Sequence, residues 1–347
     1  MDLTSYRTLG RSGLVVSPLA LGTMTFGTER WGASDDDSRR MVDRYLDLGG
    51  NLIDTADIYA RGRSETLLGQ YIAERKARDQ VVLATKFTWN MNPGNPNAGG
   101  NGRKNIHRAL EQSLLRLQTD YIDLYWLHFW DMVTPAEEVL ETMACLVRAG
   151  KIRYYALSDV PAWYASKIAV MAAERKLPGP IALQMEYSLV ERGIENEYVP
   201  LAREAGMGIM PWSPLAGGFL TGKYQQGDTA AGEGRLSGDN PFGQSKFCER
   251  NWGILKTLQE VAGDLGVPPS HVALAWARQQ SGVDCVLIGA KSAAQLDDNL
   301  APLKLELSQE IMARLNDISK PAPLFPYSTF NAGIRRHIFG GADVTVR

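Results

Sequence analysis

The chain has 347 residues, of which 44% are hydrophobic and 22% charged, and its formal net charge is −2. This composition is typical of a soluble globular protein with a large core, and the small net charge gives no electrostatic basis for binding nucleic acid or an anionic membrane. Three separated cysteines without metal-ligand spacing, no apolar run of membrane-spanning length and no signal-peptide pattern at the N-terminus lead us to expect a cytoplasmic protein.

Alternating strands and helices predict the fold. Residues 6–17 are expected to form a β-hairpin around the turn at Arg11-Ser12-Gly13. Eight strand-like stretches follow, separated by helical patterns, and eight right-handed βαβ units close a (β/α)8 TIM barrel. We therefore expect one domain over residues 1–347. The strands are expected near residues 19–23, 51–54, 81–86, 122–127, 152–157, 181–185, 207–211 and 284–288.

Three helix starts carry capping signals. Ser34 precedes an acidic first turn, and Ser64 is expected to cap the helix that follows it. Thr134 to Glu137 has the pattern of a capping box, with proline at the first helical position.

Three segments do not fit the barrel repeat. Residues 87–103 and 214–246 are rich in glycine, and each follows a strand, so we expect both on the active-site face. Residues 321–347 form an irregular tail containing several aromatic side chains, which we expect to pack over the same face.

Four polar side chains come at or just after the ends of three predicted strands. They are Asp54, Tyr59, Lys86 and His128. Because the carboxyl ends of barrel strands share one mouth, we expect these side chains to meet there. Taken singly, each has a plainer reading as a surface ion pair, a packing residue or a core histidine.

Together the four suit the protonation of a carbonyl oxygen during hydride transfer. Lys86 would lower the pKa of the Tyr59 phenol, and Asp54 would keep Lys86 charged and oriented. His128 would hydrogen-bond the reacting oxygen. The four histidines lack ligand spacing, so we expect no metal.

The same residues resemble the aldo-keto reductase signature. The resemblance rests on Asp54-Thr55-Ala56-(x)2-Tyr59, on Lys86 at a strand end and on Trp126-Leu127-His128, and it extends from Leu9 to Asn299. It is closest to the bacterial, broad-specificity branch that is similar to potassium-channel β subunits. It implies reduction of an aldehyde or ketone by a nicotinamide dinucleotide, with Tyr59 as general acid.

The cofactor site is predicted from two segments. No G-x-G-x-x-G follows a strand, and the run from Gly217 to Lys223 resembles a phosphate-binding loop but is followed by Tyr224 where Ser or Thr would bind magnesium. Backbone N–H groups of such a loop can still hold a pyrophosphate. The resemblance implies that Trp212 stacks on the nicotinamide and that Ser158, Asp159 and Gln184 hold its carboxamide. The expected cofactor-binding residues are Thr23, Met24, Ser158, Asp159, Gln184, Trp212, Ser213, Pro214, Leu215, Gly217, Leu220, Lys223, Gly289, Lys291, Gln295, Asp298 and Asn299.

Two details of this site leave alternatives open. Lys291 lies before a helix start capped by Ser292 with Gln295, where a basic residue would bind the 2′-phosphate and favour NADPH over NADH. A solvated lysine without that role, and hence NADH use, is the alternative. The family usually has asparagine where this chain has Asp159, and a carboxylate can only accept hydrogen bonds.

The substrate is the least determined part. Met24, Trp31, Trp89 and Trp130 follow strand ends or lie in mouth loops, and aromatic walls suit a bulky cyclic ketone such as a keto-mycotoxin or another xenobiotic. Some of these tryptophans are expected to pack loops together instead.

Two other functions compete with the reductase. One is an NADPH-binding regulatory protein with vestigial activity, as potassium-channel β subunits share this pattern. The other is an isomerase using Lys86 as a Schiff base, which Asp54 disfavours because it keeps the lysine charged. The oligomeric state does not follow from the sequence.

Overall fold

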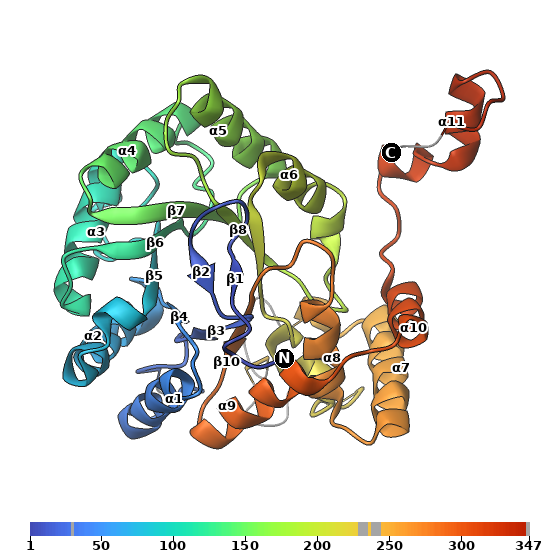
Figure 1. Cartoon of the computed structure of the whole chain (residues 1–347), viewed down its shortest axis with the longest axis horizontal. Helices are drawn as coiled ribbons and strands as arrows, with labels where there is room; N and C mark the ends of the chain where they lie inside the picture. Colours follow the sequence, from blue (N-terminus) through green and yellow to red (C-terminus); the bar gives the residue numbers. More distant parts are fainter. Residues whose placement is uncertain (29–30, 228–234, 237–243, 345–347) are drawn as a thin grey trace.

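The computed structural model describes residues 1–28, 31–227, 235–236 and 244–344. Eight parallel strands form one sheet in the order β10-β3-β4-β5-β6-β7-β8-β9. A parallel bridge between Ile209 and Val283 brings the two edges together, so the sheet is a nearly closed barrel (Figure 1). The predicted TIM barrel and its eight strands are confirmed. The strands are β3 (Leu19–Gly22), β4 (Leu52–Asp54), β5 (Val82–Phe87), β6 (Ile122–Leu127), β7 (Ile152–Ser158), β8 (Ala182–Glu186), β9 (Gly208–Trp212) and β10 (Val286–Gly289).

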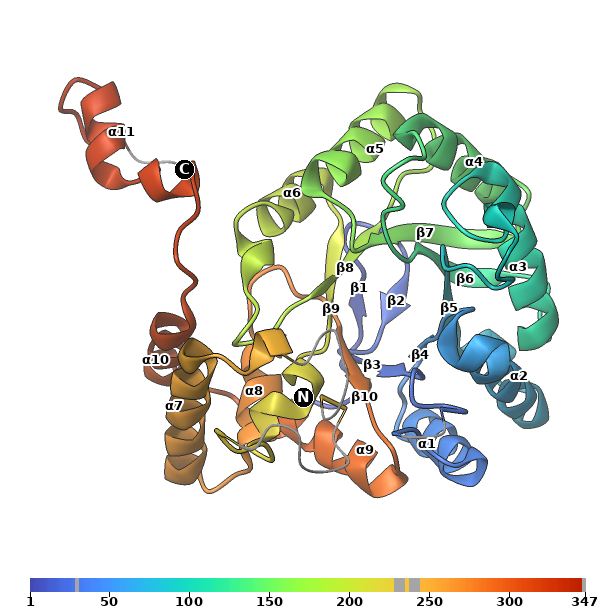
Figure 2. The same cartoon turned by 180° about the vertical axis from the view of Figure 1, so that it is seen from behind.

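Helices form the outer layer of the barrel (Figures 1 and 2). Their apolar faces pack against the outward-facing side chains of the strands in one large core. Within the described residues, no helix combines the length and the apolar character needed to cross a membrane. The helices are α1 (Asp35–Asp47), α2 (Arg63–Arg75), α3 (Arg103–Leu117), α4 (Ala136–Arg148), α5 (Ala162–Glu174), α6 (Tyr198–Ala205), α7 (Glu249–Leu265), α8 (Pro269–Arg278), α9 (Ala293–Leu300), α10 (Gln309–Ser319) and α11 (Ala332–Ile338).

The predicted N-terminal hairpin is confirmed. It consists of β1 (Arg7–Thr8) and β2 (Val15–Val16), which pair antiparallel. Its buried side chains belong to the same cluster as the side chains inside the barrel. Gly10 sits at its turn with φ +58°, and a Cβ there would lie 2.5 Å from the backbone nitrogen of Gly208. Glycine is therefore required for the hairpin to approach the barrel this closely.

The helix starts agree with the sequence only in part. Ser34 caps α1 and accepts a hydrogen bond from the Asp37 backbone, as predicted. The prediction for Ser64 is wrong, because α2 begins after Gly62 and the Ser64 hydroxyl bonds Thr23 inside the protein. The capping box at Thr134 is also wrong, since its hydroxyl donates to Asp131 and Pro135 precedes the helix.

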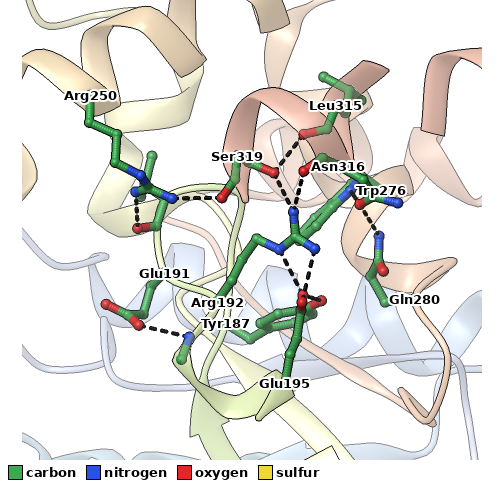
Figure 3. Close-up of polar contacts among 12 residues, drawn as sticks. Tyr187, Glu191, Arg192, Glu195, Arg250, Trp276, Gln280, Leu315, Asn316 and Ser319 are labelled. Atoms are coloured by element: carbon green, nitrogen blue, oxygen red, sulfur yellow. Dashed lines mark hydrogen bonds and ion pairs between the residues drawn. The ribbon is translucent and has the colours of Figure 1, made fainter. Parts of the chain in front are cut away.

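A buried polar network holds α10 against the barrel. Arg192 donates to the Asn316 carbonyl oxygen and to the Ser319 hydroxyl, both at 2.7 Å, and forms an ion pair with Glu195 (Figure 3). Arg250, in the first turn of α7, donates to the Ser319 carbonyl oxygen at 2.6 Å. The last turn of α10 is therefore fixed by two guanidinium groups.

The tail departs from the prediction. Figures 1 and 2 show the segment after α10 extending away from the barrel and ending in α11, so it does not cover the barrel mouth. Phe325 is 84% exposed and Phe330 68%. The Tyr327 hydroxyl donates to Glu197 at 2.8 Å, near the start of α6. Of the predicted loop 214–246, residues 228–234 and 237–243 lie outside the described residues.

Candidate active site

The barrel interior places two charged residues side by side. Side chains alternate along each strand, so Leu52 and Asp54 of β4 face inward, as do Ala84 and Lys86 of β5. Both charged side chains are fully buried, and the Lys86 ammonium forms an ion pair with the Asp54 carboxylate. The register of the two strands therefore brings the predicted pair together at the carboxyl end of the barrel.

Lys86 also reaches the phenol of Tyr59. Its Nζ atom donates to the Thr55 carbonyl oxygen at 3.0 Å and lies 3.4 Å from the Tyr59 hydroxyl. The chain turns sharply just after the tyrosine, because Ala60, Arg61 and Gly62 all have positive φ. Such a run of left-handed residues is unusual, and it lies directly beside the tyrosine whose hydroxyl approaches Lys86.

His128 completes the set of four at the end of β6. Its backbone N–H donates to the Phe87 carbonyl oxygen at 3.1 Å, and its ring lies 5.9 Å from the Tyr59 ring in an edge-on arrangement. Its Nδ1 atom is buried and has no hydrogen-bond partner among the described residues. Most buried ring nitrogens have a hydrogen-bond partner, so this atom differs from that of an ordinary core histidine.

Electrostatics define the protonation states. Burial lowers the pKa of Lys86, but the attraction of Asp54 and Tyr59 outweighs it and the net pKa lies above its ordinary value. Burial raises the pKa of Tyr59, and Lys86 offsets that effect only in part. Lys86 therefore acts on the pKa of Tyr59 in the predicted direction, but burial, which the sequence did not show, outweighs it in the free protein. Burial, with the nearby Lys86 charge, lowers the pKa of His128 well below its usual value, so the imidazole is neutral at pH 7.

The ends of β7, β8 and β9 lie beside these residues. Gln184 on β8 donates to the second Asp54 oxygen at 3.2 Å, which links this side of the mouth to the Lys86 pair. Asp159, just after β7, accepts a hydrogen bond of 3.1 Å from the Trp212 indole nitrogen at the end of β9. Ser158 is buried at the end of β7. The ends of β7, β8 and β9 therefore bring the Trp212 indole and several polar side chains to the same side of the mouth.

The glycine-rich segment after β9 forms a tight turn. Ser213 accepts a hydrogen bond of 3.0 Å from the Gly217 backbone nitrogen, while Gly217 and Gly218 have φ of +65° and +93°. A Cβ on Gly217 would come within 2.7 Å of Leu236, and one on Gly218 within 2.8 Å of the Lys223 ammonium. The backbone thus carries no side chain at Gly217 and Gly218, as in loops whose backbone N–H groups bind phosphate.

The start of α9 matches the predicted cap with one difference. Ser292 accepts from the Gln295 backbone at 3.2 Å, but the Gln295 side chain accepts from Lys291, one residue before the cap. Asn299 donates to the Gly289 carbonyl oxygen at 3.0 Å. Asp298 is paired with His271 at 2.8 Å.

Two lysines lie near each other at this end of the site. Burial and the neighbouring Lys291 charge lower the pKa of Lys223. Like charges are costly to bring together, so this pair favours an anion between the long loop and α9.

Of the predicted substrate residues, Trp89 lies beside His128, whereas Trp130 packs against a helix. Trp89 is 44% exposed and packs edge-on against His128, with ring centroids 6.2 Å apart. Trp130 packs instead against Trp163 and Tyr164 of α5, a loop-packing contact.

Arg235 is a site residue that the sequence did not reveal. Its guanidinium lies 5.4 Å from the centre of the Trp31 ring and within 3.4 Å of the Met24 sulfur, and its charge acts on Tyr59. The buried neighbour Leu236 anchors this part of the loop, its backbone N–H donating to the Tyr224 hydroxyl at 3.0 Å. An arginine inside a glycine-rich stretch carries no local signal for this position. Among the described residues, no three His, Cys, Asp or Glu side chains meet to form a metal site.

A barrel whose mouth holds an Asp–Lys ion pair, a tyrosine hydroxyl next to the ammonium and a histidine ring beside the tyrosine suits proton transfer to a carbonyl oxygen, as in carbonyl oxidoreductases. Residues 18–320 match the aldo/keto reductase family, and the chain belongs to that family.

Three curated relatives show its breadth. An uncharacterized oxidoreductase, YrpG, of Bacillus subtilis is 36% identical over 90% of this chain and 95% of the relative. A norsolorinic acid reductase of Emericella nidulans is 34% identical over 88% of this chain and 79% of the relative. A probable voltage-gated potassium channel β subunit of rice (Oryza sativa subsp. japonica) is 33% identical over 92% and 97%. The relatives therefore include a protein named as a reductase and one named as a probable channel subunit.

Proposed function

We propose that this protein reduces an aldehyde or ketone to the alcohol with NADPH, and that Tyr59 is the general acid. The observation that carries the proposal is the position of the Lys86 ammonium, which is ion-paired with Asp54 and 3.4 Å from the Tyr59 hydroxyl. Beside them, the neutral His128 has a free Nδ1 atom among the described contacts. When bound, the nicotinamide supplies the hydride.

The four residues divide the work of protonation. The raised pKa of Tyr59 keeps its proton in place until negative charge develops on the substrate oxygen. Lys86 then stabilises the phenolate that remains, and Asp54 prevents Lys86 from losing its own charge. His128, as a neutral ring, can donate one hydrogen bond to the same oxygen and fix its direction.

The residues fit a dinucleotide along one side of the mouth. Trp212 offers a flat surface for the nicotinamide, and Ser158, Asp159 and Gln184 offer polar groups to its carboxamide. The bare turn at Gly217 suits the pyrophosphate. Lys223 and Lys291 suit the 2′-phosphate, which is the basis for proposing NADPH over NADH.

The substrate proposal is a bulky cyclic ketone, including keto-mycotoxins and other xenobiotics. It is supported by the exposed Trp89 beside His128, and by the Trp31 and Met24 side chains next to Arg235. A relative named for reduction of norsolorinic acid supports the same class. The separated cysteines of the chain support a cytoplasmic location.

Tyr59→Phe tests the proposed general acid. We expect NADPH consumption with aldehydes and cyclic ketones to fall by about a hundredfold or more, because the hydroxyl proton is lost while the ring remains. NADPH binding, followed by protein fluorescence, should be unchanged. A variant that keeps wild-type turnover would exclude Tyr59 as the acid.

Lys291→Ala tests the cofactor preference. We expect the affinity for NADPH to fall about tenfold and that for NADH to stay the same, since only NADPH carries the 2′-phosphate. Equal losses for both cofactors would argue against a 2′-phosphate contact.

A second candidate function is regulatory, and the similarity to a potassium channel β subunit favours it. In that case the wild type would bind NADPH tightly and turn over none of the carbonyl compounds tested.

A further inference from the structure

Asp159 places an ionisable carboxyl group at the mouth of the barrel. It follows Ser158 at the end of β7, and its carboxyl group accepts from the Trp212 indole at 3.1 Å, while its backbone carbonyl oxygen accepts from the Trp130 backbone N–H at 3.2 Å. Its backbone is left-handed, with φ +46°, a conformation that asparagine and aspartate tolerate best among residues with a side chain. The group is therefore held firmly in one place.

The proposed function places the nicotinamide against Trp212, whose indole N–H donates to this carboxyl group. A carbonyl oxygen held between Tyr59 and His128 puts its carbon near the centre of the mouth, and a reacting ring has to approach that carbon within about 3.5 Å. Gln184 links the end of β8 to Asp54, and Trp212 lies at the end of the neighbouring strand β9. A nicotinamide ring stacked on Trp212 would lie next to Asp159, because the Trp212 indole N–H donates to the Asp159 carboxyl group.

The surroundings of Asp159 hold its titration near neutrality. Burial raises its pKa to about 7, and the Trp212 hydrogen bond acts in the opposite direction. Glu186 on β8 raises the pKa further, although Glu186 is itself paired with Lys246 at 2.7 Å. Lys86 on β5 lowers it, and the Asp159 charge in turn raises the pKa of the Tyr198 phenol on α6, whose hydroxyl donates to the Val160 carbonyl oxygen.

We propose that the Asp159 carboxylate selects the oxidised dinucleotide, whose nicotinamide ring is positively charged, over the neutral reduced form. This inference rests on the proposed function. Ionised Asp159 attracts the oxidised ring and gains nothing from the reduced one. Binding of the oxidised form is therefore coupled to loss of a proton from Asp159, and the balance between the two forms shifts with pH.

The charge can be removed with almost no change in shape. Asp159→Asn keeps an oxygen that accepts from Trp212 and fits the same left-handed backbone. NADP+ and NADPH would each be titrated against wild type and variant at about pH 6 and pH 8.5, with intrinsic fluorescence as the readout. The second ionisation of the 2′-phosphate, near pH 6, is common to both forms and cancels in the ratio of their dissociation constants.

We expect the wild-type ratio of dissociation constants, NADPH over NADP+, to rise about tenfold between the two pH values. In Asp159→Asn the ratio should be constant. Calorimetry of NADP+ binding to the wild type in two buffers of different ionisation enthalpy should also show proton release near pH 7.

A wild-type ratio independent of pH, or a variant that keeps the rise, would overturn the inference while leaving the reductase proposal intact. If the wild type binds neither nucleotide, both the inference and the proposed cofactor site fail. If the variant does not fold, the calorimetry decides, because absence of proton release from the wild type contradicts the coupling.

Discussion

Asp57 is a buried acid two residues before the proposed general acid. It is 1% exposed, and both of its carboxyl oxygens lack a hydrogen-bond partner among the described residues. Burial raises its pKa to about 8, and the nearby Glu65 adds to the effect. Nothing in the local pattern separates it from Asp54, because both follow the same short apolar run.

Asp57→Asn is expected to stabilise the protein at alkaline pH. An unfolded aspartate has a pKa near 4, so between about pH 4 and 8 the unfolded chain has lost a proton that the folded protein keeps. Stability of the wild type is therefore lost as the pH rises through this range. Asparagine resembles the protonated acid, and we expect a gain of about 1–3 kcal/mol at pH 8 and none at pH 4.

Urea unfolding across that pH range would measure the effect, with Asp79→Asn at an exposed position as the control. A destabilised variant at pH 8 would mean that Asp57 is ionised and has a partner in solution.

At the scale of the elements, the contact between α2 and α3 depends on one glycine. A Cβ on Gly69 would lie 2.5 Å from the Arg116 carbonyl oxygen and 2.8 Å from the Leu117 Cα atom. These are backbone atoms, which cannot move aside as a flexible side chain would. Gly69 is therefore a close-packing residue, although glycine is unfavourable inside a helix.

Gly69→Ala should destabilise the protein by about 1–3 kcal/mol, because overpacking outweighs the gain in helix propensity. Gly263→Ala in α7 is the matched control, since a Cβ there would meet nothing within 4 Å. It should stabilise the protein by about 0.5–1 kcal/mol. Thermal unfolding of both variants tests the pair, and a stable Gly69→Ala would show that α2 can shift without cost.

For the whole molecule, the barrel and the tail are expected to be energetically independent. The last turn of α10 is held by Arg192 and Arg250, whereas the described part of the tail is almost entirely exposed (Figure 3). A chain ending at Lys320 should keep its melting temperature within about 2 °C and its turnover, since little apolar surface is lost from the core.

A chain ending at Arg314 is the control for this truncation. It removes the buried Leu315 and the Ser319 contacts, and it should unfold at a clearly lower temperature. Loss of turnover in the longer form alone would mean that the tail reaches the mouth in solution.

Local sequence patterns determined the strands of the barrel, the Asp54–Lys86 pair and one helix cap. The eight strands follow from apolar runs that alternate with helical stretches. The place of Asp54 and Lys86 follows from the alternation of side chains along β4 and β5, which is a local property of the chain. The cap at Ser34 is local in the same way, because its partner is three residues away.

Contacts between distant segments decided the rest. Ser64 does not cap α2 as predicted, because its hydroxyl bonds Thr23 instead. Arg235 lies over Trp31, although the loop that carries it has no sequence signal for that position. Burial, which depends on every neighbour in space, raises the pKa of Tyr59 and outweighs the lowering by Lys86 that the sequence predicted. The position of the tail, which extends away from the barrel and leaves Phe325 and Phe330 exposed, is likewise set by contacts between distant segments and not by its own aromatic pattern.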